Sequence, residues 1–456
     1  MHITYRQNLS LHAAAVRVLE ARARLGSAID NLYPQQQQLQ GGLNYGDKSR
    51  RNPLLNRFNN NSFWLGQAGI SADWEIDFWG KIRRAIESSE AGLTASVADY
   101  NNVLVTLLAD VASTYVNIRT FEERLRVVRA NLEIQKSSLA IAHARSTEGQ
   151  SSQRDVEQAK SELAETQAQA PQPEIGLQQS HNALSVLLGL PPAALGDLLD
   201  PHAPIPRAPL KVAVGIPAQL LRRRPDVRAA EQQAAAESAK IGMTKAELFP
   251  AFSLSGTFGF LSSDNGAFSV GDLAQWSSRS LSVGPAFRWN ILNYGQITNQ
   301  VRAQDAVFQQ AVLAYQQQVL QAQREVEDAL VAFLRAQEAV DSLSRAVAAA
   351  RRSVELATIQ YREGQTDYTT VLTAQQALVR QQNQLAVARG DVPQGLIGIY
   401  RALGGGWQIR EGRPLVPAQI KAEMAERTDW GGLLDFDDGA LQPPATGLLP
   451  PPWPEL

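Results

Sequence analysis

An internal duplication constrains this 456-residue chain more than any other feature of its sequence. The segment Trp74–Ile82 returns as Trp289–Ile297, at an offset of 215 residues (289 − 74). The same offset relates two further pairs of short motifs, Glu148-Gly149-Gln150 to Glu363-Gly364-Gln365 and Leu188-Gly189 to Leu403-Gly404. A repeat of this length indicates one structural plan that is built twice and packs with approximate internal symmetry.

Each copy contains two segments in which apolar and polar side chains alternate. The four segments lie near residues 36–46, 67–78, 251–261 and 280–291. A period of two places all the apolar side chains of a segment on one face. Segments of about ten residues with one apolar face are typical of transmembrane β-barrel strands, although a half-buried soluble sheet alternates in the same way. The aromatic residues expected to face lipid or its boundary are Trp74, Phe78, Trp79, Phe258, Phe260, Phe287 and Trp289.

Each copy also contains a long heptad pattern. Apolar residues recur every seven positions from Val312 to Tyr361, and again from Val97 to Leu139. A heptad repeat kept over this length predicts a supercoiled helix, and a helix from Ile82 to Ser146 would be roughly 100 Å long. Return helices are expected over Gln153–Leu188 and Tyr368–Leu403, with local breaks at Pro173 and Pro393 because proline removes a helical hydrogen bond.

These patterns divide the chain into four parts. Residues 1–190 form the first repeat, with one helix, two strands, a long helix and a return helix. Residues 191–223 form a proline-rich connector, in which Arg222-Arg223-Arg224 is most simply a solvated turn. Residues 224–405 form the second repeat. Residues 406–456 are proline-rich, and we expect an unpacked, disordered tail there.

Composition and motifs argue against several classes of function. The net charge is −2, from 43 basic and 45 acidic side chains, so no nucleic-acid partner is expected. The sequence has no cysteine, no paired histidines at metal-ligand spacing and no phosphate-binding or nucleophile motif. Asp73, Glu75 and Asp77 alternate along one strand and are interpreted as a wetted face. We therefore expect neither an enzyme nor a cofactor or metal.

The number of strands constrains the assembly. One chain offers four candidate membrane strands, whereas small membrane barrels need about eight. An open four-stranded sheet in lipid would leave two unpaired edges, which a bilayer does not tolerate. If the strands cross a membrane, the barrel must be shared, and three chains would supply twelve strands. The alternative is a soluble coiled-coil scaffold whose strands form a small packed sheet.

Several motifs resemble the TolC family of outer membrane efflux proteins, close to its OprM- and NodT-like lipoprotein branch. They are Asn31-Leu32-Tyr33-Pro34-Gln35, Trp74–Gly80, Gly215-Ile216-Pro217, Leu221–Val227, Ile241-Gly242, Leu248-Phe249-Pro250 and Tyr400–Trp407. The resemblance implies a mainly α-helical homotrimer with a twelve-stranded β-barrel in the outer membrane of a Gram-negative bacterium. Coiled-coil helices would continue this barrel across the periplasm as an α-helical barrel.

The resemblance also implies partners and a role. The partners would be outer membrane lipid, a periplasmic adaptor (membrane fusion) protein and an inner-membrane pump of the RND type. The role would be a passive export duct for drugs or other small molecules, with the exit duct of a protein-secretion system as the alternative. The chain lacks a signal peptide and the cysteine that family lipoproteins acylate, so we expect a truncated gene model or a processed fragment.

The resemblance further implies a gate at the periplasmic helix tips. Family members often carry a pattern similar to Leu-Asp-Ala-Gln-Arg, but here Thr373 stands at the aspartate position and Gln376 at the arginine position. The substitute candidates are Asp367, Tyr368 and Tyr361, beside the turn residues Gly149 and Gly364. Three copies of Asp367 around a threefold axis would attract cations. The alternative is that Asp367 only caps the return helix.

Overall fold

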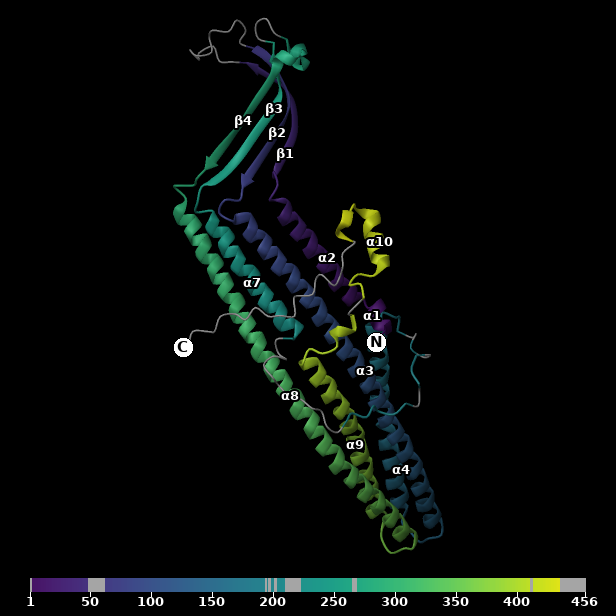
Figure 1. The fold of residues 1–456 in the computed structure, drawn as a ribbon. Coiled ribbons are helices and arrows are strands. Elements are labelled where there is room, and N and C mark those ends of the chain that lie inside the picture. The colour runs from purple at the N-terminus through teal and green to yellow at the C-terminus, as the bar shows by residue number, and fades with distance from the viewer. Residues whose placement is uncertain are drawn as a thin grey trace, which may run out of the picture. The chain divides into compact units, whose positions relative to one another are not determined.

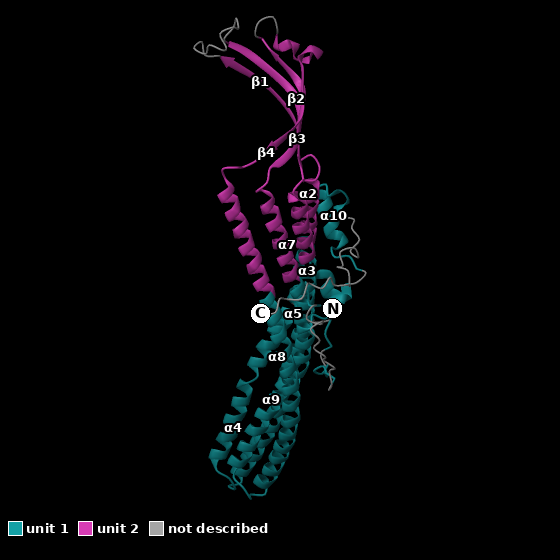
Figure 2. Cartoon of the chain, turned by 60° about the vertical axis from the view of Figure 1, so that its left-hand side comes forward, with its two compact units in different colours: residues 1–17, 97–228, 316–456 teal, residues 18–96, 229–315 magenta. Residues whose placement is uncertain are grey.

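The computed structural model describes residues 2–47, 62–192, 195, 198–200, 203–209, 223–264, 269–410 and 413–434. The chain divides into two compact units (Figure 2). Unit 1 comprises Met1–Arg17, Val97–Arg228 and Gln316–Leu456, and unit 2 comprises Val18–Ser96 and Ala229–Tyr315. Each unit draws segments from both sequence repeats, so the compact units and the duplication divide the chain differently.

Unit 2 contains one antiparallel sheet of four strands in chain order (Figure 1). The strands are β1 (Gln36–Asp47), β2 (Ser62–Ile76), β3 (Ala251–Ser263) and β4 (Arg279–Arg288). They confirm the four strands predicted from alternation, to within a few residues at each end. Among the described residues, β1 pairs only with β2 and β4 only with β3, so both outer strands present a free edge.

The register of the sheet separates its two faces. Four apolar residues lie side by side across it, Leu39, Ile70, Phe258 and Leu281. The next row is polar, with Gln38, Ser71, Thr257 and Ser282. Leu39 is 84% exposed and Leu281 is 70% exposed. The apolar face is therefore left open to the surroundings of the chain, where an isolated soluble sheet would bury it.

Hydrogen bonds in unit 2 reproduce the duplication. Helix α2 (Leu9–Asp30) leads into β1, and α7 (Pro225–Ala246) leads into β3. The indole Nε1 of Trp74 donates to the carbonyl oxygen of Leu32 at 3.0 Å, and that of Trp289 donates to Leu248 at 3.1 Å. Donors and acceptors occupy matching positions in the two copies. The sequence repeat is thus a structural repeat.

Unit 1 is helical. It contains α1 (His2–Gln7), α4 (Gln153–Ala168), α5 (Pro171–Leu188) and α9 (Tyr368–Ala402), together with the later parts of α3 (Lys81–Thr147) and α8 (Tyr294–Arg362). The predicted heptad forms the core along α3, where Val97, Leu104, Val111, Ile118 and Leu125 are all buried. None of the helices in the described ranges has both the length and the apolarity that crossing a membrane requires.

Proline interrupts the first return helix but not the second. The first breaks between Ala168 and Pro171, just before the predicted position, and Pro173 itself lies inside α5. Pro171 begins α5 at a position where no helical hydrogen bond is lost. The second continues through Pro393, so the predicted break there is wrong. Close packing explains the continuity. A Cβ on Gly395 would lie 2.8 Å from the Cα of Phe333 in α8, and one on Gly390 would overlap Thr120 of α3.

Two expectations about irregular segments need correction. Part of the predicted tail is ordered, because α10 (Ala418–Arg427) forms there and Leu415, Val416 and Met424 are buried. Residues 435–456 and much of the connector at 191–223 lie outside the described residues. Arg224 is not in a solvated turn. It is 5% exposed and pairs with Asp226 at 2.6 Å and with Glu325 at 2.8 Å.

Candidate functional site at the helical tips

The two long helices end in the same backbone motif. Just after α3, the amide of Gly149 donates to the carbonyl oxygen of Ser146 at 3.1 Å and that of Gln150 donates to the carbonyl oxygen of Arg145 at 2.8 Å. Just after α8, the amide of Gly364 donates to the carbonyl oxygen of Tyr361 at 3.1 Å, and that of Gln365 donates to the carbonyl oxygen of Gln360 at 2.8 Å. Both glycines are left-handed, with φ of 74° and 75°. These are the paired bonds of a Schellman cap, which glycine adopts without steric cost.

A short side chain caps each return helix. The Ser152 side chain accepts from the Arg154 amide at 3.1 Å. The matching residue, Asp367, accepts from the amide of Thr370 at 3.3 Å and from its hydroxyl at 3.1 Å. Asp367 is exposed. Its carboxylate therefore performs the capping role that was the alternative to a charged ring.

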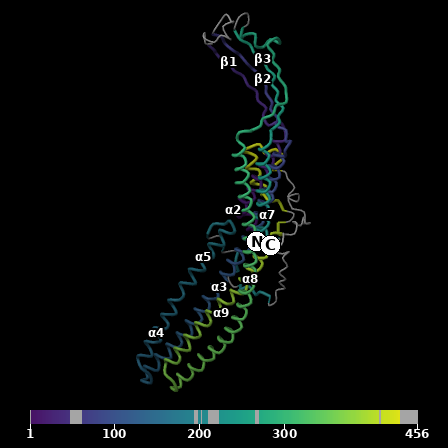
Figure 3. Tube along the Cα trace, turned by 90° about the vertical axis from the view of Figure 1, so that its left-hand side faces the viewer, coloured from purple at the N-terminus to yellow at the C-terminus, as the bar shows by residue number. Residues whose placement is uncertain are grey.

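Both tips lie at the same end of unit 1, where α3, α4, α8 and α9 run side by side (Figure 3). Tyr361 at the end of α8 and Tyr368 at the start of α9 are 3% and 1% exposed. Their ring centroids lie 5.4 Å apart in an edge-to-face arrangement. Val354, Ala357, Val371 and Leu378 belong to the same apolar core. The two predicted tyrosines are thus brought together.

Polar groups from α3 and α4 complete this cluster. The Tyr361 hydroxyl lies 3.4 Å from Oδ2 of Asp155, which is buried. The Arg145 guanidinium lies 5.0 Å from the centre of the Tyr361 ring and donates to the carbonyl oxygen of Arg362 at 2.8 Å. We call Arg145, Asp155, Glu162, Tyr361 and Tyr368 the tip cluster. It links the ends of four helices by side-chain contacts.

Burial raises the pKa of Tyr361, Tyr368 and Glu162 in this cluster. It raises the pKa of Tyr368 to about 12, and nearby Glu162, Tyr361 and Asp155 add to the shift. Burial also raises the pKa of Glu162 above its ordinary value, which the hydrogen bond from Gln376 opposes. That bond is 2.8 Å long, and Gln135 donates to the other Glu162 oxygen at 3.3 Å. The cluster favours neutral phenols and is built to hold helices together.

The remaining predicted tip residues lie outside the cluster or at its edge. Thr373 is exposed, and its hydroxyl donates to the carbonyl oxygen of Thr369 at 2.9 Å. Gln376 joins the cluster through Glu162. Sequence reasoning missed Arg145, Asp155 and Glu162. Asp155 is in the first turn of α4, where an acidic residue is expected for helix-dipole reasons alone, so its role is visible only in three dimensions.

A second pattern on α3 could have revealed Arg145. Polar residues recur every seven positions at Asn117, Arg124, Asn131, Ser138 and Arg145, and each of the first four immediately precedes an apolar heptad position. Each of the first four is hydrogen-bonded to α9. Their partners are Gln394 at 3.0 Å, Asn383 at 2.8 Å, Gln382 at 2.7 Å and Gln375 at 2.6 Å. We call this the polar ladder, and Arg145 continues it to the end of α8.

The predicted aromatic residues gather at the base of the sheet and on its open face. The rings of Trp79 and Phe249 stack with their centroids 4.6 Å apart, and the indole Nε1 of Trp79 donates to the carbonyl oxygen of Pro250 at 2.9 Å. The ring centroids of Phe78 and Phe252 lie 5.5 Å apart, and those of Phe258 and Phe260 lie 5.8 Å apart. Trp289, Phe287 and Phe78 are more than half exposed, and Trp74 is 36% exposed. Indoles with a bonded N–H and an exposed ring are common at membrane boundaries.

Comparisons with known proteins agree with this architecture. The family model for "Outer membrane efflux protein" matches residues 3–190 and 216–405, close to the two predicted repeats. The pyoverdine export outer membrane protein OpmQ of Pseudomonas putida is 33% identical over 416 residues, covering 87% of this chain and 83% of that protein. The solvent efflux pump outer membrane protein SrpC of Pseudomonas putida is 32% identical over 347 residues, covering 76% and 72%. The outer-membrane channel OprN aligns with a TM-score of 0.82 at 31% identity, covering 89% of each chain.

Proposed function

The chain belongs to the outer membrane efflux protein family, and from this premise we propose that it is the outer-membrane duct of a tripartite efflux pump. In this role it carries small molecules, drugs among them, out of a Gram-negative cell and performs no chemistry on them. Its partners are two further copies of itself, a periplasmic adaptor protein and an inner-membrane pump of the RND type. Named relatives export pyoverdine or solvents, so we propose that the inner-membrane pump selects the substrate.

The open sheet carries the proposal. Its apolar face exposes Leu39, Leu281, Val283 and Phe287, and its outer strands have free edges among the described residues. Lipid tolerates exposed aliphatic side chains but not unpaired backbone groups. Both features are satisfied together if three sheets join edge to edge into a barrel of twelve strands. The opposite polar face, which includes Ser71 and Thr257, would then line a wet interior.

Crosslinked mass measurement in detergent tests this proposal directly. We expect a species of three chains, and extraction from membranes that requires detergent. A chain that purifies from the soluble fraction as a monomer with its sheet buried would contradict the duct and favour the coiled-coil scaffold.

We further propose that the tip cluster holds the periplasmic end of the duct closed. Passage of a solute requires the ends of α8 and α9 to move, and the contacts of Tyr361 with Asp155 and Arg145 resist that movement. Replacing Tyr361 with Phe removes the hydroxyl and keeps the ring. We expect a higher frequency of open events in planar bilayers, and an unchanged frequency would exclude the hydroxyl contact from gating.

Asp367 can be tested for a separate role in ion selection. Asn caps helices as well as Asp does, so Asp367→Asn removes the charge and keeps the cap. If three carboxylates form a ring in the closed or open duct, we expect lower cation selectivity at unchanged stability. Unchanged selectivity would leave Asp367 as a helix cap alone.

A further inference from the structure

An apolar cavity in unit 1 is separate from the tip cluster and from the sheet. Its volume is about 480 Å³, within the range of about 300–1,000 Å³ that small-molecule sites occupy. Residues of α1, α3, α5 and α9 line it, together with described residues of the connector. The proposed duct does not account for this cavity, because a passive conduit needs no apolar site beside its helices.

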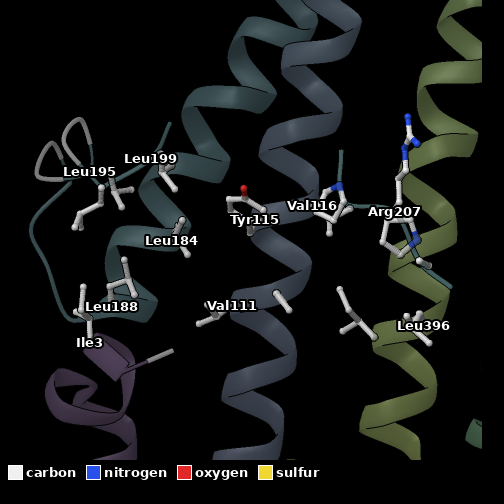
Figure 4. Close-up of a pocket in the computed structure, with 16 residues that line it drawn as sticks. Ile3, Val111, Tyr115, Val116, Leu184, Leu188, Leu195, Leu199, Arg207 and Leu396 are labelled. Atoms are coloured by element: carbon white, nitrogen blue, oxygen red, sulfur yellow. The ribbon is translucent and has the colours of Figure 1, made fainter. Parts of the chain in front are cut away.

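The lining of the cavity differs between its two ends (Figure 4). At one end Ile3, Leu184, Leu188, Leu195 and Leu199 form a purely aliphatic wall. At the other end, Arg207 lies beside Val116 and Leu396. Val111 and Tyr115 of α3 lie between them. The cavity is therefore aliphatic over most of its length, and Arg207 borders its other end.

Charge complementarity selects the head group of a ligand. Arg207 is the sole charged residue among the described residues that line the cavity, and no carboxylate lines it. The side chain is exposed, so its guanidinium can meet an anion without losing its hydration. Arginine binds a carboxylate through two parallel N–H donors. An aliphatic wall with one arginine at its end is complementary to a chain that carries one acidic group.

We propose that this cavity binds a fatty-acid-like amphiphile, with its single straight alkyl chain against the leucine end and its carboxylate at Arg207. The cavity volume of about 480 Å³ is large enough for one alkyl chain of about twelve carbons. Binding fastens α1 and the connector to α3, α5 and α9. The inference is independent of transport through the duct, since it concerns a site on unit 1 alone.

Equilibrium binding of dodecanoate to the full-length protein in amphipol tests the proposal. We expect saturable binding of one molecule per chain. Each methylene removed from the chain should weaken Kd about fourfold, so decanoate should bind more weakly by about an order of magnitude. Absence of saturable binding, or affinity that does not depend on chain length, would overturn the proposal.

Variants locate the bound molecule. Val111→Trp fills the middle of the cavity and should abolish binding, and Ala112→Met is a milder filling change if the first variant assembles poorly. The matched control, Leu313→Trp, alters a side chain of α8 that is 54% exposed and should bind as the parent does. Dodecanoate that binds equally to parent and both filling variants is held elsewhere, as an adventitious additive only, and the site is then excluded.

Head-group recognition is tested separately. Arg207→Gln should weaken dodecanoate about twofold to fivefold, as expected for one exposed ion pair, and leave dodecanol unchanged. Arg207→Lys should restore most of the loss. Equal weakening of the acid and the alcohol would show that Arg207 does not pair with the head group. A dodecanoate with a terminal diazirine should label the leucine end, and labelling confined to β1–β4 would place the ligand on the sheet instead.

Discussion

The tip of α3 and the tip of α8 have the same backbone but different chemistry. Both end in a left-handed glycine with the same pair of hydrogen bonds, and both are followed by a capped return helix. The second copy supplies the buried rings of Tyr361 and Tyr368, where the first copy has Ser146 and Gln153. The first copy supplies Arg145 and Asp155, where the second has Gln360 and Thr370. After duplication, the backbone was kept while the side chains became complementary partners.

Truncation to alanine at the matched positions Tyr361 and Ser146 should give the largest difference in stability between the two tips. Tyr361→Ala empties a buried site and should cost about 3–5 kcal/mol of local stability. Ser146→Ala should change it by less than about 0.5 kcal/mol, as at an ordinary surface position. Amide hydrogen exchange at the two turns measures both opening free energies. Equal effects would mean that the tip cluster does not depend on the ring.

Arg145 provides the next largest test. Arg145→Gln removes charged hydrogen bonds to the α8 end and the contact with the Tyr361 ring, at a cost of about 1.5–3 kcal/mol. The matched control is Gln360→Ala at an exposed site, which should be close to neutral. We expect protection from exchange to fall at Gly364 in the first variant. A loss confined to the α3 turn would contradict the proposed link.

High pH should destabilise the α9 tip, because this tip contains the buried phenol of Tyr368. The pKa of Tyr368 is about 12 in the folded chain and about 10 for an unfolded tyrosine, so the folded state holds its proton more tightly. Stability of the α9 tip should therefore be lost as pH rises from about 10 to about 12, by on the order of 2 kcal/mol. Tyr368→Phe should remove this part of the pH dependence. Exchange protection that falls equally in both proteins would contradict the assignment.

Substitution of the two turn glycines, Gly149 and Gly364, should give the smallest difference in stability between the two tips. Gly149→Ala and Gly364→Ala both place a Cβ at positive φ, at a cost of about 1–2 kcal/mol each. At Gly149 a Cβ would meet no atom within 4 Å, and at Gly364 it would lie 3.3 Å from a flexible Arg145 nitrogen. Melting temperatures of the two variants should thus fall together. A much larger loss at Gly364 would indicate that the tip cluster also fixes the turn.

Local patterns predicted the elements well, because period and offset are properties of nearby residues. The alternation in β1–β4, the heptads of α3 and α8 and the two turns all follow from such patterns. The contacts of the tip cluster could not be predicted in the same way. Arg145 and Tyr361 are 216 residues apart, and no local rule pairs them. The helix continues through Pro393 for a related reason, because α9 packs against α3 and α8, whose residues are distant in the sequence.

The polar ladder has one more consequence, for the alignment of α3 with α9. Because its rungs repeat every seven residues, sliding one helix by about 10 Å would again bring polar groups opposite polar groups. Hydrogen bonding alone would leave two alignments close in energy. The close approach of Gly390 to Thr120 has no such periodic copy, because the residues seven positions away are Asn383 and Ile397 and a side chain at this contact would overlap α3. A single glycine thus distinguishes the native alignment from a one-heptad slip.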